Sequence, residues 1–211
     1  MLTTEIKYLN WKADYDVVVI GFGAAGATAA RFAADHKQKV LLIDSAPYGY
    51  EGGNSRYCGQ IVGTSNNFNE MKKYYEALTK PMNLSNNMIN TYVQGMVDMP
   101  KYFKKYLCPP VSFKKYAAKN NILQKILYEY PEFPGVKSYD FTMVTPQTFN
   151  SALWKLLQQK IIERSKYIDV WLKSPARHLI QDSRRKVVGV QVQRKHQRVY
   201  VHAKKGIVLS C

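Results

Sequence analysis

Cysteine is rare in this sequence, and long hydrophobic runs are absent. The three cysteines, Cys58, Cys108 and Cys211, lack the paired spacing of a zinc site or a disulfide framework, which fits a reducing compartment. No uncharged apolar run approaches about 18 residues, the length needed to span a membrane. The residues before the first predicted strand also contain no long apolar core. These absences predict a cytoplasmic protein with no membrane span and no metal site.

Acidic residues are scarce as well. The chain has 15 Asp and Glu against 31 Lys and Arg, a net charge of +16 and a pI of about 9.7. Such an excess suggests anionic partners, among them nucleic acid or an acidic substrate. The basic residues lie in separate segments, however, such as 72–73 and 184–186, and a solvated surface explains that dispersion. Sixteen tyrosines lie among these charges, so nucleic-acid binding stays as the alternative.

The stretch 15–44 has the pattern of a complete strand, turn, helix and strand. Residues 17–20, VVVI, form a β-branched run typical of a parallel strand that is buried on both faces. Residues 24–34 are rich in alanine and predict a helix, and residues 40–43 predict the second strand. With 211 residues, the chain is long enough for one large domain or two small ones.

Three glycines with the spacing G-x-G-x-x-G join the first strand to the helix. Gly21 allows a sharp turn, Gly23 lets backbone approach a pyrophosphate, and Gly26 lets the helix lie close to the sheet. The free N–H groups at the start of the helix suit phosphates. Asp44 ends the second strand, where a carboxylate accepts hydrogen bonds from ribose hydroxyls and repels a 2′-phosphate. The unit therefore predicts FAD or NAD rather than NADP.

Residues 46–63 form a glycine-rich stretch that we expect to be a loop near the ligand. Gly52, Gly53, Asn54 and Ser55 could wrap backbone N–H groups and two short polar side chains around phosphate or flavin atoms. An ordinary surface turn is the alternative.

The remaining segments predict an α/β fold, with a Rossmann-type parallel sheet, a β-meander and an inserted helical region. Residues 67–80 and 88–107 predict helices, the second stopped by Pro109 and Pro110, and 111–143 predict loops and short elements. A helix starts at Thr145 and Pro146 and runs to about Arg164. Five strands follow, at 168–172, 176–181, 187–193, 199–202 and 207–210, of which the middle three alternate like an antiparallel meander.

The motifs YDVVVIGFGAAGATAA and EGGNSRYCGQ together resemble the amino-terminal part of the fumarate reductase and 3-ketosteroid dehydrogenase group of FAD flavoproteins. The segment SPARHLIQDSRRKVVGVQV resembles the β-meander of the same group, whose leading residues pass the adenine. Members with covalent flavin carry His near the place of Asn54, so the resemblance implies noncovalent FAD. It implies these cofactor-binding residues: Gly21, Gly23, Ala24, Ala25, Gly26, Asp44, Ser45, Gly52, Gly53, Asn54, Ser55, Gly59 and Ala176.

Three positions carry further expectations. Lys37 stands where the family often has glycine at the end of the first helix, so a left-handed cap there costs about 1 to 2 kcal/mol. Cys58 is expected to be a buried, inert thiol, with a reactive thiol near the flavin as the alternative. His178 is expected to be a strand-surface residue rather than a catalyst.

The resemblance covers nearly the whole sequence but only the first part of a family protein, so the fold is expected to be incomplete at its C-terminus. In relatives, the catalytic residues follow the last strand found here, and none can be assigned in this chain. The predicted segments are 1–66 and 145–211 for the FAD-binding domain and 67–144 for the insertion. A complementary C-terminal portion is then an expected partner.

The resemblance implies an oxidoreductase that moves a hydride between flavin N5 and an activated carbon–carbon bond. Reduction of an unsaturated acid and dehydrogenation of a ketosteroid are the two reactions considered. A basic chain would steer an anionic small-molecule substrate. The alternatives are a truncated remnant, a noncatalytic nucleotide-binding module completed by a partner, and a nucleic-acid binder that reuses the fold.

Overall fold

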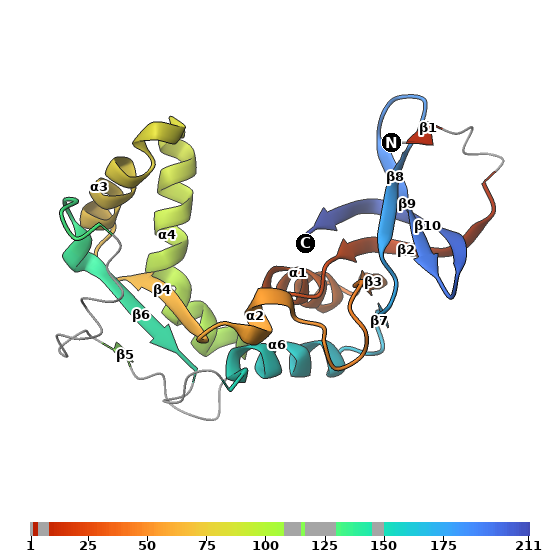
Figure 1. The fold of residues 1–211 in the computed structure, drawn as a ribbon, viewed down its shortest axis with the longest axis horizontal. Helices are drawn as coiled ribbons and strands as arrows, with labels where there is room; N and C mark the ends of the chain where they lie inside the picture. Colours follow the sequence, from red (N-terminus) through yellow and green to blue (C-terminus); the bar gives the residue numbers. More distant parts are fainter. Residues whose placement is uncertain (1, 4–8, 108–114, 117–129, 145–149) are drawn as a thin grey trace. The chain divides into compact units, whose positions relative to one another are not determined.

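The computed structural model describes residues 2–3, 9–107, 115–116, 130–144 and 150–211 (Figure 1). The chain divides into two compact units. Unit 1 comprises Met1–Cys58 and Leu153–Cys211, and unit 2 comprises Gly59–Ala152. The segment boundaries predicted from the sequence remain a prediction.

Unit 1 is built on one seven-stranded sheet with the order β1-β8-β9-β10-β2-β3-β7. Strand β2 pairs in parallel with β3 and with β10 from Tyr200 to Leu209, and β3 pairs in parallel with β7. Strands β8, β9 and β10 form an antiparallel meander within the same sheet. The predicted α/β fold with a mainly parallel sheet and a meander is confirmed. The strands are β1 Leu2–Thr3, β2 Trp11–Ile20, β3 Val40–Ile43, β7 Ile168–Trp171, β8 Ala176–Gln181, β9 Val187–Arg194 and β10 Gln197–Leu209.

The predicted strands 199–202 and 207–210 are in fact one strand, β10. Lys204 and Lys205 look like a charged turn in the sequence. In the structure they lie where the register between β10 and β2 shifts, between the pairs Ala203 with Tyr15 and Gly206 with Val17. The extra residue is absorbed as a β-bulge, so the strand continues through it.

The first predicted strand is buried on both faces, as its continuous apolar run requires. Val18 and Val19 point to opposite faces of the sheet, and neither is exposed to solvent. Helix α1, Ala24–Asp35, buries small residues such as Ala27 and Ala30. Val190 and Val192 of β9 join side chains of β2 and β3 in one apolar cluster. Buried side chains therefore hold β2 and β3 in place and fix where the loops after these strands begin.

Helix α1 ends in a Schellman motif, and its left-handed residue is Lys37, as the sequence predicts. Lys37 has φ of 58°. Its N–H donates to the carbonyl of Ala34 at 2.8 Å, and the N–H of Gln38 donates to the carbonyl of Ala33 at 3.1 Å. These two bonds satisfy carbonyls at the helix end that would otherwise lack partners.

Lys37→Gly is expected to raise the free energy of unfolding by about 1 kcal/mol, because glycine adopts the left-handed conformation without a Cβ penalty. Urea unfolding of both proteins measures the difference. Lys12→Gly is the matched control, since it removes the same charge from an exposed position within β2. That control should lower stability because glycine weakens a strand. An equal change in both variants would contradict the assignment of the cap.

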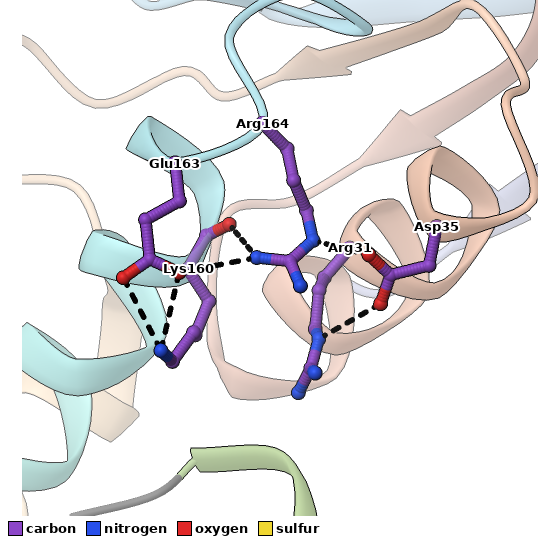
Figure 2. A network of polar contacts seen from close by, with 5 residues as sticks. All are labelled: Arg31, Asp35, Lys160, Glu163 and Arg164. Carbon is purple, nitrogen blue, oxygen red and sulfur yellow. Dashed lines mark hydrogen bonds and ion pairs between the residues drawn. The ribbon is translucent and has the colours of Figure 1, made fainter.

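A network of charges joins α1 to the segment after helix α6, Ala152–Ile162 (Figure 2). Asp35 accepts from Arg164 Nε at 2.6 Å and from Arg31 Nε at 3.2 Å. Arg164 also contacts Glu163 at 3.3 Å, and Glu163 pairs with Lys160 at 3.1 Å. Burial acts to raise the pKa of Asp35, but the hydrogen bonds and charges of Arg164 and Arg31 outweigh it and hold that pKa below its usual value.

Asp35→Asn is expected to lower the free energy of unfolding by about 1 kcal/mol at pH 7, a modest value because the pair is partly exposed and screened by solvent. The folded-state pKa lies below the unfolded one, so the stabilisation is present above about pH 4 and is lost as the pH falls through the folded value. Urea unfolding at pH 7 and pH 3 tests this. Glu76→Gln, which removes an exposed pair with Lys72, is the control and should matter less. If the parent and Asp35→Asn differed in free energy of unfolding as much at pH 3 as at pH 7, the charge of Asp35 would not be the cause.

Unit 2 combines helices with a second sheet. Helices α3, Phe68–Leu78, and α4, Asn86–Tyr102, begin at side-chain caps provided by Asn67 and Ser85. A π-helical turn, Phe103–Leu107, continues α4. These helices match the predicted ones within a few residues. Their buried side chains, among them Met71 and Val93, form a separate apolar cluster.

The prediction of a helical and irregular insertion was incomplete. Strands β4, Ile61–Ser65, β5, Lys115–Tyr116, and β6, Tyr139–Met143, form an antiparallel sheet with the order β4-β6-β5. β4 falls in the predicted loop and β6 in the predicted irregular region. The two strands lie more than 70 residues apart in the sequence, so the residues near one strand do not show that it pairs with the other.

Two predicted boundaries lie outside the described residues. These are the helix stop at Pro109 and Pro110 and the helix start at Thr145 and Pro146, and Cys108 lies outside them too. In the described part, Ser151 has φ of 58° and α6 begins at Ala152. The described residues directly before α6, Asn150 and Ser151, are therefore not helical, contrary to the prediction.

Candidate functional site

A cavity of about 510 Å³ lies at the carboxyl ends of β2, β3 and β10. This edge is where open α/β sheets bind ligands, because the loops there leave a crevice. Four of the predicted site residues line the cavity together: Gly21, Asp44, Ser45 and Ala176. The structure thus brings together positions that are up to 155 residues apart in the sequence.

Two glycines of the turn are required by the packing of the protein itself. Gly21 has φ of 103°, and a Cβ there would lie 2.7 Å from the carbonyl oxygen of Ser210. A Cβ on Gly26 would lie 1.8 Å from the carbonyl oxygen of Gly21. Both contacts are with backbone, which cannot swing away. Gly26 therefore sets how closely α1 approaches the end of β2.

Gly23 is different, because nothing in the described protein requires a glycine there. It caps α1 with φ of −86° and ψ of −167°, an extended conformation open to any residue. A Cβ would meet the Gly52 carbonyl oxygen at 3.6 Å and Ser55 Oγ at 3.7 Å, which are ordinary contacts. Because Gly23 has no side chain, there is room above the turn. A ligand that occupies this room would explain the glycine.

The start of α1 offers a positive environment for an anion. The first N–H groups of a helix have no partner within the helix. One of them, that of Ala24, donates instead to Ser55 Oγ at 3.0 Å. Among the described residues, nothing accepts from the N–H groups of Ala25 and Gly26, and the first turn holds no acidic residue. Free N–H groups and the helix dipole together favour negative charge at this end.

Asp44 organises the loops around the cavity. Its Oδ2 accepts from the N–H of Phe22, inside the glycine turn, at 2.6 Å, and its Oδ1 accepts from the N–H of Ala46 at 2.8 Å. A carboxylate has about four acceptor positions, so these two bonds leave capacity for a ligand. The sequence predicts the ribose contact but not this structural role.

The predicted loop at Gly52 to Ser55 is largely a short helix, α2, Gly53–Tyr57. Gly52 precedes it with φ of 114°, and a Cβ there would lie 2.8 Å from the ring of Trp154. Gly53 and Asn54 are exposed, while Ser55 turns toward α1. The structure places Ser55 beside the glycine turn, as expected for a loop near the ligand. It does not test which atoms Gly53 and Asn54 contact.

A buried carboxylate that was not predicted supports this helix. Glu51 is 2% exposed, and its Oε1 accepts from Gln158 Nε2 of α6 at 2.7 Å. Arg56 Nη1 lies 3.9 Å from the same oxygen and donates to the Glu51 carbonyl at 3.1 Å. Glu51 and Gln158 are 107 positions apart, so the sequence does not show that they are in contact. The only local sign of a role for Glu51 was its place directly before two glycines.

The link between β7 and β8 forms one wall of the cavity. Ser174 is fully buried, and its N–H donates to the Asp44 carbonyl at 2.9 Å. This bond fixes Ala176 next to the end of β3, where both line the cavity. His178 lies on β8 and is exposed, as predicted.

Two other predicted positions lie elsewhere. Cys58 is exposed, so the expectation of a buried thiol was wrong. It follows directly after the short helix α2, which leaves its side chain near the surface, donating to the Ser55 carbonyl at 3.6 Å. Gly59 belongs to unit 2 and is half-buried there.

In the part of the chain that the structure describes, no group of three or more His, Cys, Asp or Glu side chains is arranged to hold a metal ion. None of the helices in the described part of the chain has both the length and the apolar character for a membrane crossing.

Comparison with known proteins agrees with this geometry. The digeranylgeranylglycerophospholipid reductase of Picrophilus torridus is 30% identical over 193 residues. Among solved structures, the 3-ketosteroid-Δ4-(5α)-dehydrogenase of Rhodococcus jostii RHA1 superposes with a TM-score of 0.76 at 18% identity over 99% of this chain. A flavocytochrome c3 fumarate reductase gives a TM-score of 0.70 at 21% identity over 95% of the chain. These structures share the fold, and the predicted resemblance is confirmed.

The chain spans less than half the length of these proteins: 38% of the phospholipid reductase, 48% of the steroid dehydrogenase and 34% of the fumarate reductase. The phospholipid reductase match covers 92% of this chain. The sequence model of the family described as "FAD binding domain" matches residues 16–211. Because that match includes nearly the whole chain, the protein belongs to the FAD binding domain family.

Proposed function

We propose that this chain binds FAD noncovalently as the nucleotide-binding part of an oxidoreductase that transfers a hydride between flavin and an activated carbon–carbon bond. The pyrophosphate is held at the start of α1, a ribose by Asp44, and the adenine along the wall that contains Ala176. Asp44 and Ala176 line one cavity with Gly21, and this shared lining supports a single extended ligand.

The observation that carries the proposal is the unexplained glycine at position 23. Gly21 and Gly26 are accounted for by contacts of 2.7 Å and 1.8 Å within the protein, but Gly23 has only contacts of 3.6 Å or more. The protein has room for a Cβ at this position, and the glycine leaves that space open for a ligand. The adjacent N–H groups favour an anion, so a pyrophosphate fits both features.

The reaction class is proposed from the relatives. One is named as a reductase of a phospholipid, one as a dehydrogenase of a ketosteroid and one as a fumarate reductase. Reduction and dehydrogenation are the two directions of the same hydride transfer. Flavin supplies that chemistry when bound, while the protein binds and orients it. The substrate is proposed to be a small molecule.

Noncovalent attachment is supported by the chemistry of α2. Its residues, GNSRY, include no histidine that could form a bond to the flavin ring. Asn54 stands where the covalent members of the resembling group carry their histidine. The flavin should therefore leave the protein when the chain unfolds.

An absorbance spectrum of the purified chain, before and after denaturation and filtration, tests the proposal. We expect flavin bands near one equivalent per chain after incubation with FAD, and free FAD in the filtrate after unfolding. Flavin retained on the denatured chain would contradict noncovalent binding. A folded, colourless protein that takes up no added FAD would contradict FAD binding by this chain.

A further inference from the structure

A second cavity, of about 550 Å³, lies where the β7–β8 link meets the hairpin between β9 and β10. Its size falls within the range of small-molecule sites, roughly 300 to 1,000 Å³. Four of its seven lining residues are basic and none is acidic: Lys173, Arg194, Lys195 and His196. Leu172 and Pro175 supply an apolar wall.

The walls of this cavity are fixed by backbone hydrogen bonds. Gln193 N–H donates to the Pro175 carbonyl at 3.0 Å, which joins the end of β9 to the link. Lys173 N–H donates to the Ala46 carbonyl at 2.9 Å, which ties the link to the loop after β3. The cavity is therefore a preformed feature, and a ligand would find its walls already in place.

Arg194 is held in a defined position at this cavity. Its guanidinium carbon lies 4.3 Å from the ring centre of Trp171, and Nη1 donates to Ser174 Oγ at 3.1 Å. A guanidinium has five N–H donors, so most remain available. Within the described residues, no carboxylate forms a salt bridge with Arg194, and Asp169 accepts from the Tyr15 hydroxyl at 2.7 Å.

Three of the basic residues have a backbone conformation that favours glycine or asparagine. Lys195 and His196 are the two central residues of the hairpin and have φ of 46° and 64°. Such two-residue turns favour Asn-Gly because both positions require positive φ. Lys173, on the opposite wall, has φ of 49°. These three residues place basic side chains at the cavity from both of its walls.

We propose that this cavity binds a small phosphate-bearing anion. Arg194 would present its planar fork to the phosphate oxygens, and the two lysines would add charge from opposite walls. The apolar wall would hold the uncharged part of the ligand. The site is separate from the glycine turn, and the proposal does not rest on FAD binding.

Calorimetric titration with pyrophosphate, at constant ionic strength and with saturating FAD, tests the site. We expect one pyrophosphate per chain. Lys195→Asn and Lys173→Asn should each weaken binding about tenfold, the value of one hydrogen bond to a charged group. Because asparagine tolerates positive φ, both variants should stay folded. A titration without FAD should give the same dependence on Lys195, which separates this result from any failure to bind FAD.

Arg185→Asn is the matched control. Arg185 is exposed, has φ of 63° and lies at the other turn of the meander, so this variant removes the same charge from the same kind of backbone. It should leave pyrophosphate affinity within about twofold, because a distant exposed charge is largely screened. Equal weakening in all three variants, or none in any, would overturn the proposal. A short single-stranded oligonucleotide that binds more tightly than pyrophosphate and is weakened equally by Arg185→Asn would also overturn it, in favour of a diffuse nucleic-acid surface.

Discussion

Gly23→Val is expected to reduce FAD affinity at least about 100-fold, about 2.8 kcal/mol, while the chain stays folded. The Cβ itself meets protein atoms only at 3.6 Å and beyond, and the backbone is already extended. The loss of affinity would come from the two methyl groups, which occupy the space above the turn where the pyrophosphate must approach. Fluorescence titration with FAD measures the affinity, and urea unfolding without FAD measures the stability.

Gly23→Ala and Gly26→Ala complete this experiment. The alanine at 23 should give a smaller loss of affinity and lower the free energy of unfolding by no more than about 1 kcal/mol, since glycine is the better helix cap. The alanine at 26 should lower it by roughly 3 kcal/mol, because its Cβ would overlap the Gly21 carbonyl at 1.8 Å. If Gly23→Val bound FAD as tightly as the parent, the pyrophosphate would not lie at this turn.

The contrast between these glycines shows what a sequence pattern can and cannot predict. The spacing G-x-G-x-x-G after an apolar strand predicts the turn, the helix and the strand that follows, and all three are present. The pattern also predicts that Gly21 and Gly26 serve the fold and that Gly23 serves a ligand. It cannot show the contacts behind the first role, because the Ser210 carbonyl that a Cβ on Gly21 would meet is distant in the sequence.

Elements defined by long-range pairing were the ones the sequence did not predict. Strands β4 and β6 pair across more than 70 residues. β4, IVGTS, shows no clear alternation, whereas β6, YDFTM, alternates apolar and polar residues, and that local signal was missed. Helix α2 is five residues long. The hydrogen bond between Glu51, just before the helix, and Gln158 stabilises it, rather than helix propensity. Long helices such as α3 and α4 were predicted because their apolar periodicity is a local pattern, which does not depend on contacts with distant residues.

The candidate site shows the same division. Asp44 was predicted because it ends a recognisable strand pattern, and Ala176 because its segment resembles the β-meander of the family. The bonds from Phe22 and Ala46 to Asp44 were not predicted, since backbone donors leave no trace in the residue types. The second cavity was missed for a related reason, because its basic residues look like charged turns until the meander brings them together.

Asp44→Ala is expected to lower both stability and FAD affinity. The change removes two hydrogen bonds from backbone N–H groups to a charged acceptor, at 2.6 Å and 2.8 Å. In a half-buried position we expect about 2 to 3 kcal/mol lower free energy of unfolding without FAD. If the carboxylate also accepts from ribose, FAD affinity should fall by a further factor of about 10 to 100.

Asp16→Ala separates these two roles. Asp16 also accepts from a backbone N–H, that of Lys39 at 2.9 Å, but it lies near the start of the parallel strands and does not line the cavity. This control should lower stability by about 1 kcal/mol and leave FAD affinity unchanged once the chain is folded. If Asp44→Ala behaved in the same way, with lower stability but full affinity, then Asp44 would only brace the glycine turn. The ribose would then have to be held by other groups of the cavity, of which Ser45 is the one beside it in sequence.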